Sequence, residues 1–545
     1  MQQGPERQVR RRRLYIVLNP VKFATTPCPP TPVANAAPYV TATRNVRRTD
    51  TQASSTPLAL HPDRFFDPDP SIRRVARELF EETRHLPLIC PHGHVDPKVL
   101  AENRPFPEPT AVLITPDHYI FRLMYSRGVP MESLGIPTRD GTATARDPRE
   151  VWTTFAAHYY LFRGTPTGAW LDHELHDLFG VRVKLTADTA LHVYDEIAEK
   201  LQSPEFLPRA LFDRFNIEVL ATTDAATDPL DHHQAIRDSD WDGTVVPCFR
   251  PDALFRIASP EWADAIDRLG GVHGTSITTF ATFLDALAER RRFFASMGAT
   301  STDHAVVDPY TERLPALEAE ALFARALGRA ATAADQRRFE AHMLMEMARM
   351  STDDGLVMQI HPGSLRDHHD AVAARFGPDM GADMPIVTEY TRNLRALLNA
   401  YGADPRLTLI LYTLDESTYA RELAPLAGHY PAVKLGSPWW FHDSIEGLTR
   451  FRQQTTETAG IHNTAGFNDD TRAFCSIGAR HDLARRVDAN FLAGLVARHI
   501  VDTSEAREMA RALAYEIPKA TYKLNGVSRR AEHSGAHIAS LEAVR

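Results

Sequence analysis

The sequence predicts an α/β fold, a (β/α)8 barrel of the TIM type with a helical insertion after the first strand. Three observations support it: short β-rich runs that end in polar residues, helical patterns between most of them, and a long helical stretch after the first run. Strands that alternate with helices pair in parallel, and eight such units close a barrel. A doubly wound open sheet is the competing architecture. The β-rich runs are 86–90, 217–220, 244–249, 301–302, 356–360, 407–411, 432–435 and 464–467.

Residues 1–60 are expected to be a disordered tail or the product of a mis-assigned start codon. Arg10–Arg13 and the apolar run after them imitate a secretory signal, but the run stops at Asn19, short of the roughly 7–15 apolar residues that a signal needs. The rest of this stretch is rich in Thr, Pro, Ala and Ser. The barrel is expected over 61–525, followed by a flexible tail at 526–545.

The helical elements follow from apolar residues at helical spacing. Pro70 and Ser71 open a helix with an apolar face that includes Leu79 and Phe80. After the strand at 86–90, the stretch at about 98–215 carries few strand signals and is expected to be the insertion beside the barrel mouth. Between later strands, helices are expected at 336–350 and 386–400.

Two histidines, His92 and His94, lie one residue apart at the end of the first apolar run. Alternate residues of a strand point to the same face, so both imidazoles can reach one metal ion. With 24 histidines in the chain, chance pairs are expected, and two loop histidines bonded to backbone are the alternative. On a barrel, Asp470 after the eighth strand would join them. Two imidazoles and a carboxylate suit a divalent metal such as zinc, with positions open for substrate.

Composition excludes several classes of function. The chain has 545 residues, 43% hydrophobic, with a net charge of -9, so it offers a large core and no basic face for nucleic acid. No apolar run is long enough to span a membrane. Four scattered cysteines without a C-x-x-C pair argue against a disulfide framework and favour a reducing cytoplasm. The helical region near 482–525 is compatible with internal packing or with a homo-oligomer interface.

The chain resembles the uronate isomerase (glucuronate isomerase) family of the amidohydrolase superfamily from about His61 to Tyr522. Co-linear segments carry this resemblance, each similar to a motif of that family. They are Leu86–His94, Asp117–Tyr119, Trp170–Leu175, Thr222–Asp224, Arg250–Asp252, Asp303–His304, Met358–His361 with Gly363 and Arg366, Gly436–Phe441, Asp469–Arg472 and Arg485–Arg486.

The chain departs from the family pattern in several places. Ala225 and Ala226 stand where the family usually has Asp-Pro, and Gly168 and Ala169 replace a Tyr-His pair. Pro362, Ser364 and Asp367 differ from the residues that usually follow the strand-five histidine. The proposed metal ligands are kept, so these departures bear on substrate preference more than on chemistry.

The resemblance implies interconversion of an aldose uronate and its ketose, such as D-glucuronate and D-fructuronate or D-galacturonate and D-tagaturonate, through an enediol. Asp470 would take the C2 proton, Arg472 would stabilise the enediolate, and His118 and Tyr119 would polarise the C1 oxygen or shuttle the proton. Arg209 is the candidate clamp for the distal carboxylate, with Arg214 as its rival. The substrate-binding set is Arg209, His304, His361, Arg366, Trp439 and Trp440, and the metal set is His92, His94 and Asp470.

Each role has a structural alternative. Asp470 could cap a helix, Arg472 and Arg366 could form structural ion pairs, and one of Trp439 and Trp440 is expected in the core. His361 could be a further metal ligand or only a pocket wall. At the level of function, the alternatives are a metal-dependent hydrolase on the same barrel, which a missing histidine after the sixth strand disfavours, and an inactive barrel that binds sugar acids.

Overall fold

The computed structural model describes residues 56–527. The predicted tails at 1–60 and 526–545 therefore lie mostly outside the described residues, as does Cys28. Ordered structure begins earlier than the expected His61, because Pro57 forms an antiparallel bridge with Val183 and Leu58 donates its N–H to the carbonyl of Arg182. Leu58 is buried, which gives this short segment a hydrophobic contact as well.

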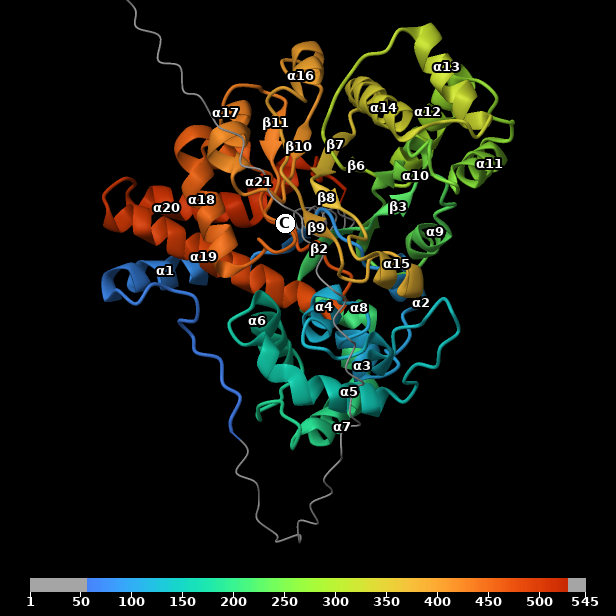
Figure 1. Ribbon diagram of the computed structural model, residues 1–545. Helices are drawn as coiled ribbons and strands as arrows, with labels where there is room; N and C mark the ends of the chain where they lie inside the picture. Colours follow the sequence, from blue (N-terminus) through green and yellow to red (C-terminus); the bar gives the residue numbers. More distant parts are fainter. Residues whose placement is uncertain (1–55, 528–545) are drawn as a thin grey trace, which may run out of the picture. The chain divides into compact units, whose positions relative to one another are not determined.

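Parallel strands follow one another in sequence order at the centre of the described chain (Figure 1). Hydrogen bonds join β1 to β2 and β2 to β4, and a second ladder joins β3, β5, β6, β7, β10 and β11 in that order. The strands are β1 (Leu88–Cys90), β2 (Ile217–Ala221), β3 (Asp224–Ala225), β4 (Thr244–Val246), β5 (Phe249–Arg250), β6 (Ser301–Val306), β7 (Val357–Pro362), β10 (Leu409–Leu411) and β11 (Val433–Leu435). Because β3 and β5 continue β2 and β4 after two-residue gaps, the ladders follow seven successive barrel strands.

The eighth segment is the least regular part of the barrel. Thr464 forms only a parallel bridge with Leu435, so the run predicted as a strand at 464–467 is shorter than expected. Farther along, the N–H of His94 donates to the carbonyl of Thr471 at 3.0 Å, which ties the segment after β1 to the segment after the eighth run. The strands are parallel and follow the sequence order, and the eighth segment is tied back to the first. These features confirm the predicted (β/α)8 barrel.

The strands are buried on both faces, as expected of a parallel sheet covered by helices. Alternate residues point into the barrel, where Ile89, Val219, Val357 and Ile410 pack in one cluster. Their neighbours point outward against the helices.

The outer helices follow the strands, and Figure 1 places α10–α14 on one side of the barrel and α17–α20 on another. The predicted first helix is α1, capped by the Asp69 side chain. The helices are α1 (Pro70–Thr83), α9 (Asp231–Arg237), α10 (Asp252–Phe255), α11 (Trp262–His273), α12 (Phe280–Ser296), α13 (Ala316–Leu327), α14 (Ala333–Asp354), α15 (Asp370–Phe376), α16 (Arg395–Tyr401), α17 (Ala424–Ala427), α18 (Ile445–Ala459), α19 (Ile477–Ala497), α20 (Thr503–Arg511) and α21 (Ile517–Thr521).

The helix expected at 386–400 forms only at its end, as α16, so that prediction was wrong for its first half. The carboxylate of Glu422 accepts from the N–H groups of Tyr390 and Thr391, and Asp415 accepts from the N–H of Thr388. In a helix that began at 386, the N–H groups of Tyr390 and Thr391 would bond to carbonyls four residues earlier, so Glu422 takes two donors that the helix needs. Tyr390 is buried all the same, so its apolar side chain serves the core without a helix.

The stretch between β1 and β2 is helical, in agreement with the expected insertion. Within the described residues it holds no strand, apart from the single bridge at Val183. It has its own hydrophobic cluster around Trp152, Phe155 and Phe162, and α3–α7 lie together below the barrel in Figure 1. Its helices are α2 (Pro97–Glu102), α3 (Pro109–Leu113), α4 (His118–Tyr125), α5 (Pro148–His158), α6 (Pro166–His173), α7 (Ala190–Leu201) and α8 (Pro208–Arg214).

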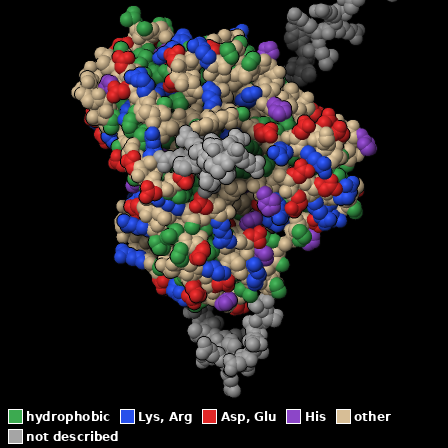
Figure 2. All heavy atoms as spheres, turned by 180° about the vertical axis from the view of Figure 1, so that it is seen from behind, with side chains coloured by type: hydrophobic (Ala, Val, Ile, Leu, Met, Phe, Trp, Pro, Cys, Tyr) green, Lys and Arg blue, Asp and Glu red, His purple; other side chains and the backbone are tan. Residues whose placement is uncertain are grey.

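The surface carries charges of both signs. Figure 2 shows acidic and basic side chains interspersed over one face of the molecule, without a broad area of positive charge. Within residues 56–527, no helix combines the length and the apolar character that a membrane crossing requires.

Candidate active site

A cavity of about 410 Å³ opens at the carboxyl ends of the barrel strands. Residues that follow five different strand segments line it, which is the arrangement expected of a barrel active site. The insertion contributes the start of α4, and the connection between β7 and β10, which contains the hairpin of β8 (Ser364–Leu365) and β9 (Met384–Pro385), contributes a further wall. The polar lining residues are His92, His94, Asp117, His118, Tyr119, Arg250, Asp252, Arg256, Asp303, His361, Arg366, Asp367, Asp379, Asp470, Thr471, Arg472 and Arg480.

His92, His94 and Asp470 converge in this cavity. The Nε2 atoms of His92 and His94 lie 3.6 and 3.3 Å from Oδ1 of Asp470. Metal–ligand bonds of about 2.0–2.1 Å at tetrahedral angles place ligand atoms roughly 3.3 Å apart, so the observed spacing is close to that of a coordination shell. Oδ1 of Asp470 is buried without a hydrogen-bond partner. An orphaned carboxylate oxygen between two imidazoles fits a divalent cation.

Protonation states also suit a cation at this group. Burial lowers the pKa of His92 to about 4, although Asp303 and Asp470 oppose the shift, so the ring keeps a free lone pair at neutral pH. Burial by itself would raise the pKa of Asp470, but the approach of His94 and the charge of the neighbouring imidazoles outweigh it and hold the pKa below its usual range. A neutral imidazole and an ionised carboxylate are the forms that bind metals.

The backbone of Asp470 is left-handed, with φ of 41°. Asp is one of the few residues that tolerate this region, and such positions concentrate where a site fixes a side chain. The next helical turn begins at Phe474 with Ala473 at its start, so Asp470 does not cap a helix. Its carboxylate faces the histidines, which removes the structural alternative for this residue.

Asp303, His361 and Arg250 form the next wall. Nδ1 of His361 lies 2.6 Å from Oδ1 of Asp303, and a guanidinium nitrogen of Arg250 lies 3.5 Å from its other oxygen. Burial opposes ionisation of Asp303, but the charges of His361 and Arg250 hold its pKa well below the usual range. Nε2 of His361 is buried without a partner, and its ring lies 4.7 Å from that of His92. His92, Asp303 and His361 therefore make a second, overlapping group that could hold a metal ion.

His118 and Tyr119, at the start of α4, both line the cavity. The Tyr119 hydroxyl donates to the carboxylate of Asp443 at 3.0 Å, and Arg480 pairs with the same carboxylate at 3.2 Å. Burial, together with Asp443, raises the pKa of Tyr119 well above its usual value. Burial lowers the pKa of His118. Both side chains are therefore neutral at pH 7, and Tyr119 carries a proton that it can donate.

Arg472 and Arg366 share one acidic partner, Asp379. The Arg472 guanidinium lies 2.8 Å from Asp379 and that of Arg366 lies 3.2 Å from it, while Arg366 also pairs with Asp383 at 2.7 Å. Both arginines line the cavity and both are held in ion pairs, so the structural alternative is present at these positions and the substrate roles stay predictions. Arg472 is 43% exposed, which leaves its other donors free to reach a ligand.

Trp439 and Trp440 differ in their surroundings. Trp439 is buried in the cluster that fills the barrel and lies against the ring of His361 at 4.8 Å. Trp440 is partly exposed, with Arg366 over its face at 4.7 Å and His118 against its edge. Trp439 is thus the core residue of the pair, and Trp440 offers the more accessible ring to the cavity.

The chain matches the sequence profile of the family described as glucuronate isomerase over residues 71–522. A uronate isomerase of Rhizorhabdus wittichii is 55% identical over 471 residues, which cover 86% of this chain and all of that protein. The chain belongs to the glucuronate isomerase family.

Solved structures of the same family agree with this assignment. The glucuronate isomerase of Caulobacter crescentus is 50% identical, with a TM-score of 0.84 over 86% of this chain and 98% of that one. The uronate isomerase of Thermotoga maritima is 29% identical, with a TM-score of 0.80 over 85% and 99% of the two chains. Because these alignments cover 85–86% of this chain, the likeness includes both the barrel and the helical insertion.

Arg209 does not reach the cavity of this family member, and its prediction as a substrate clamp requires correction. Its guanidinium donates to the carbonyls of Leu100 and Ala101 at 2.9 and 3.1 Å and lies over the ring of Trp241. Those carbonyls belong to the last turn of α2, where a cation satisfies unpaired acceptors and the helix dipole. Arg209 is thus a helix-capping residue, with Nε and one terminal nitrogen engaged by the end of α2.

His304 also lies outside the cavity, contrary to its prediction as a lining residue. It is fully buried, its Nε2 lies 3.1 Å from the hydroxyl of Thr302, and its ring stacks on Phe255. Successive residues of β6 point to opposite faces, so Asp303 faces the barrel interior while His304 faces the helices. The family motif includes both Asp303 and His304, and the alternation of side chains along β6 leaves only Asp303 in the lining of the cavity.

Arg250, Asp303, Asp379 and Arg480 line the site but were not among the predicted site residues. Arg250 and Asp303 had a usable signal, since each lies in a strand end that matches a family segment. Asp379 and Arg480 had none, because one lies in a long connection and the other within a helix.

Proposed function

We propose that this chain interconverts an aldohexuronate and the corresponding ketohexuronate, such as D-glucuronate and D-fructuronate or D-galacturonate and D-tagaturonate. The observation that carries the proposal is the convergence of His92, His94 and Asp470 in one cavity with several arginines, in a member of the glucuronate isomerase family. The carboxylate and imidazoles suit proton transfer at one end of a sugar acid, and the guanidinium groups suit its carboxylate at the other.

The residues proposed to hold a divalent ion such as zinc are His92, His94 and Asp470, with His361 nearby as a further donor. The orphaned Asp470 oxygen and the neutral His92 ring support this assignment. When bound, such an ion would supply positive charge that orients the polar end of the substrate and polarises its oxygens.

Proton transfer is assigned to Asp470, whose ionised carboxylate accepts the C2 proton and returns it to C1. Its low pKa makes it a weak base, so the acidity of the C2 proton must be raised by donors to the carbonyl oxygen. His118 and Tyr119 line the cavity as neutral groups. The Tyr119 hydroxyl proton, which is donated to Asp443 in the unliganded site, would turn from that carboxylate to the substrate oxygen. Arg472 stabilises the negative charge of the enediolate.

The distal carboxylate is assigned to the wall formed by Arg250 and Arg256. Nε of Arg250 donates to Asp252 at 2.7 Å and one terminal nitrogen lies 3.5 Å from Asp303, which fixes the guanidinium plane. The remaining N–H groups could bind a ligand. Arg256 lines the same cavity, and an opposing charge near it is that of Glu340, whose pKa it lowers against the effect of burial. A second guanidinium beside a fixed one suits a carboxylate-terminated substrate.

The decisive experiment is a coupled turnover assay on glucuronate and galacturonate, with and without a chelator. We expect aldose–ketose turnover with at least one of them, and solvent hydrogen at C1 of the product when the reaction runs in heavy water. Turnover with neither uronate, together with release of ammonia or carboxylate from amide or ester substrates, would replace the proposal with a hydrolase.

A further inference from the structure

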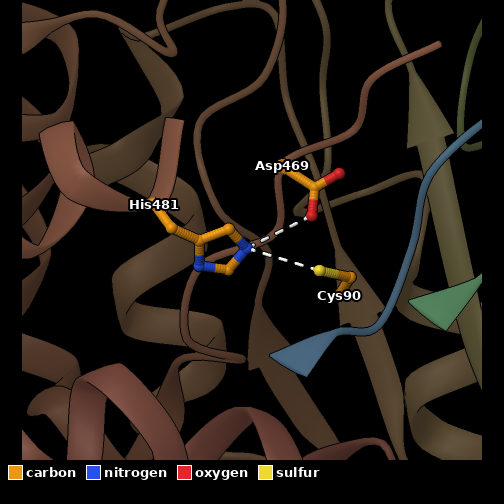
Figure 3. A group of neighbouring side chains, drawn as sticks. All are labelled: Cys90, Asp469 and His481. Carbon is orange, nitrogen blue, oxygen red and sulfur yellow. Dashed lines mark hydrogen bonds and ion pairs between the residues drawn. The ribbon is translucent and has the colours of Figure 1, made fainter. Parts of the chain in front are cut away.

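Behind the candidate active site lies a third group of metal-binding side chains, Cys90, Asp469 and His481. Figure 3 shows the sulfur of Cys90 and the carboxylate of Asp469 both directed at one ring nitrogen of His481. Cys90 ends β1, Asp469 precedes Asp470, and His481 lies in the second turn of α19. All three residues are 4% exposed or less. They are separate from the residues that line the cavity of the proposed reaction.

The geometry of this group matches a coordination shell. The Cys90 sulfur lies 3.6 Å from Nε2 of His481, and the same nitrogen lies 3.2 Å from Oδ2 of Asp469. Zinc–sulfur bonds of about 2.3 Å and zinc–nitrogen bonds of about 2.0–2.1 Å, at tetrahedral angles, place sulfur and nitrogen roughly 3.6 Å apart and nitrogen and oxygen roughly 3.3 Å apart. Both observed distances agree with these values.

Without a metal, the Asp469 carboxylate is the acceptor of the group, because Nε2–H of His481 and the Cys90 thiol can both donate to it. The Cys90 sulfur and Nε2 of His481 then face each other at 3.6 Å as two donors, whereas a cation would bind all three atoms. Among the ion pairs of residues 56–527, Asp469 pairs with His481 alone. The nearby Arg480 donates to the carbonyl of Asp469 and Arg485 to backbone carbonyls between 83 and 87, so neither guanidinium donates to the buried carboxylate.

We propose that Cys90, Asp469 and His481 form a second metal site, for a thiophilic divalent ion such as zinc. Binding exchanges the thiol proton for the metal and releases that proton to solvent. A dication with one thiolate and one carboxylate is neutral overall, which suits a buried position. Thiolate and imidazole are ligands that favour zinc over magnesium or calcium.

A second cavity adjoins this site and shares no lining residue with the substrate cavity. His481 lines this cavity of about 240 Å³, whose other donors include His173, Asp177 and Asp482. We take this cavity as the entry route and as the source of a solvent ligand for the fourth coordination position. The site therefore has ligands, spacing and access, which are the features expected of a genuine metal centre.

Cobalt(II) is the probe that separates this site from the proposed catalytic one, because only this site contains sulfur. The chelator-treated protein is titrated with Co²⁺, and bound cobalt and near-ultraviolet thiolate-to-cobalt absorption are measured. We expect two cobalt ions per chain and a thiolate band. Cys90→Ser should lose the band and one cobalt, whereas His94→Ala should lose the other cobalt and keep the band.

The matched control is Cys475→Ser, since Cys475 is also buried and lines the second cavity but is not in the group. It should keep the band and both cobalt ions. If Cys90→Ser does not fold by circular dichroism, Asp469→Asn, which keeps the side-chain shape, should bind one cobalt fewer and lose the band. A wild-type protein without a thiolate band, or a band that persists in Cys90→Ser, would overturn the proposal and leave a hydrogen-bonded group. Uronate turnover is not a readout here, so failure of the proposed reaction does not affect the outcome.

Discussion

The assignment of the substrate carboxylate to Arg250 rather than Arg209 can be tested with a pair of conservative substitutions. Arg250→Lys keeps the charge but removes the planar fork that binds a carboxylate through two parallel hydrogen bonds. Losing one charge-assisted bond of about 1.5–3 kcal/mol reduces kcat/KM by about 10- to 150-fold. We expect most of this loss in KM, because the distal carboxylate binds alike in the ground and transition states.

Arg209→Lys provides the contrast. Its guanidinium makes two hydrogen bonds to the carbonyls that end α2, so the substitution should lower the free energy of unfolding by about 1–2 kcal/mol and leave kcat/KM within about twofold. The assay is steady-state turnover on both uronates well below the melting temperature, with urea unfolding of each variant. An Arg209→Lys protein of normal stability with a large loss of kcat/KM, beside a fully active Arg250→Lys protein, would refute the assignment.

The remaining predictions concern the base, the acidic loop and a buried histidine. Asp470→Asn should keep its fold by circular dichroism yet lose turnover by about 100-fold or more, and retained turnover would remove it as the base. Asp379→Asn should lower KM for a uronate by about two- to fivefold, an effect of order 0.5–1 kcal/mol, because it removes the carboxylate that competes with the substrate for Arg472. A KM that is unchanged or raised would count against that competition. Burial lowers the pKa of His304 to about 3, below the usual 6.5, so the unfolded chain binds more protons and stability should fall as pH drops from about 6.5 to 3. His304→Gln should remove up to about 5 kcal/mol of this pH dependence, measured by urea unfolding across that range, and an identical pH profile would show that His304 is not the cause.

Much of the architecture follows from local sequence pattern. Short apolar runs that end in polar residues predicted the strands, because a strand buried on both faces needs apolar side chains until it reaches the barrel mouth. The same logic identified His92, His94 and Asp470, which leave their strands at one rim. It also identified His361 as a pocket wall. These predictions succeeded because each depends on a few neighbouring residues and on the parallel order of the strands.

Predictions that depended on distant partners were less successful. The apolar spacing at 386–400 resembles a helix, but Glu422 and Asp415 bind the backbone of its first half. Arg209 has the chemistry of a carboxylate clamp, and only its position beside the end of α2 gives it another role. In both cases, a hydrogen bond to a residue distant in the sequence decides the local structure or the role of the side chain.

The barrel, the family and the histidine–aspartate group could be predicted from the sequence, since periodicity and motif order can be recognised without knowledge of contacts. Three features became known only from the folded chain: which member of the Asp303–His304 pair faces the cavity, which arginines line it, and that Cys90, Asp469 and His481 meet. A side chain's function depends on its partners, and residues as far apart as Cys90 and His481, 391 positions, become neighbours only when the chain has folded.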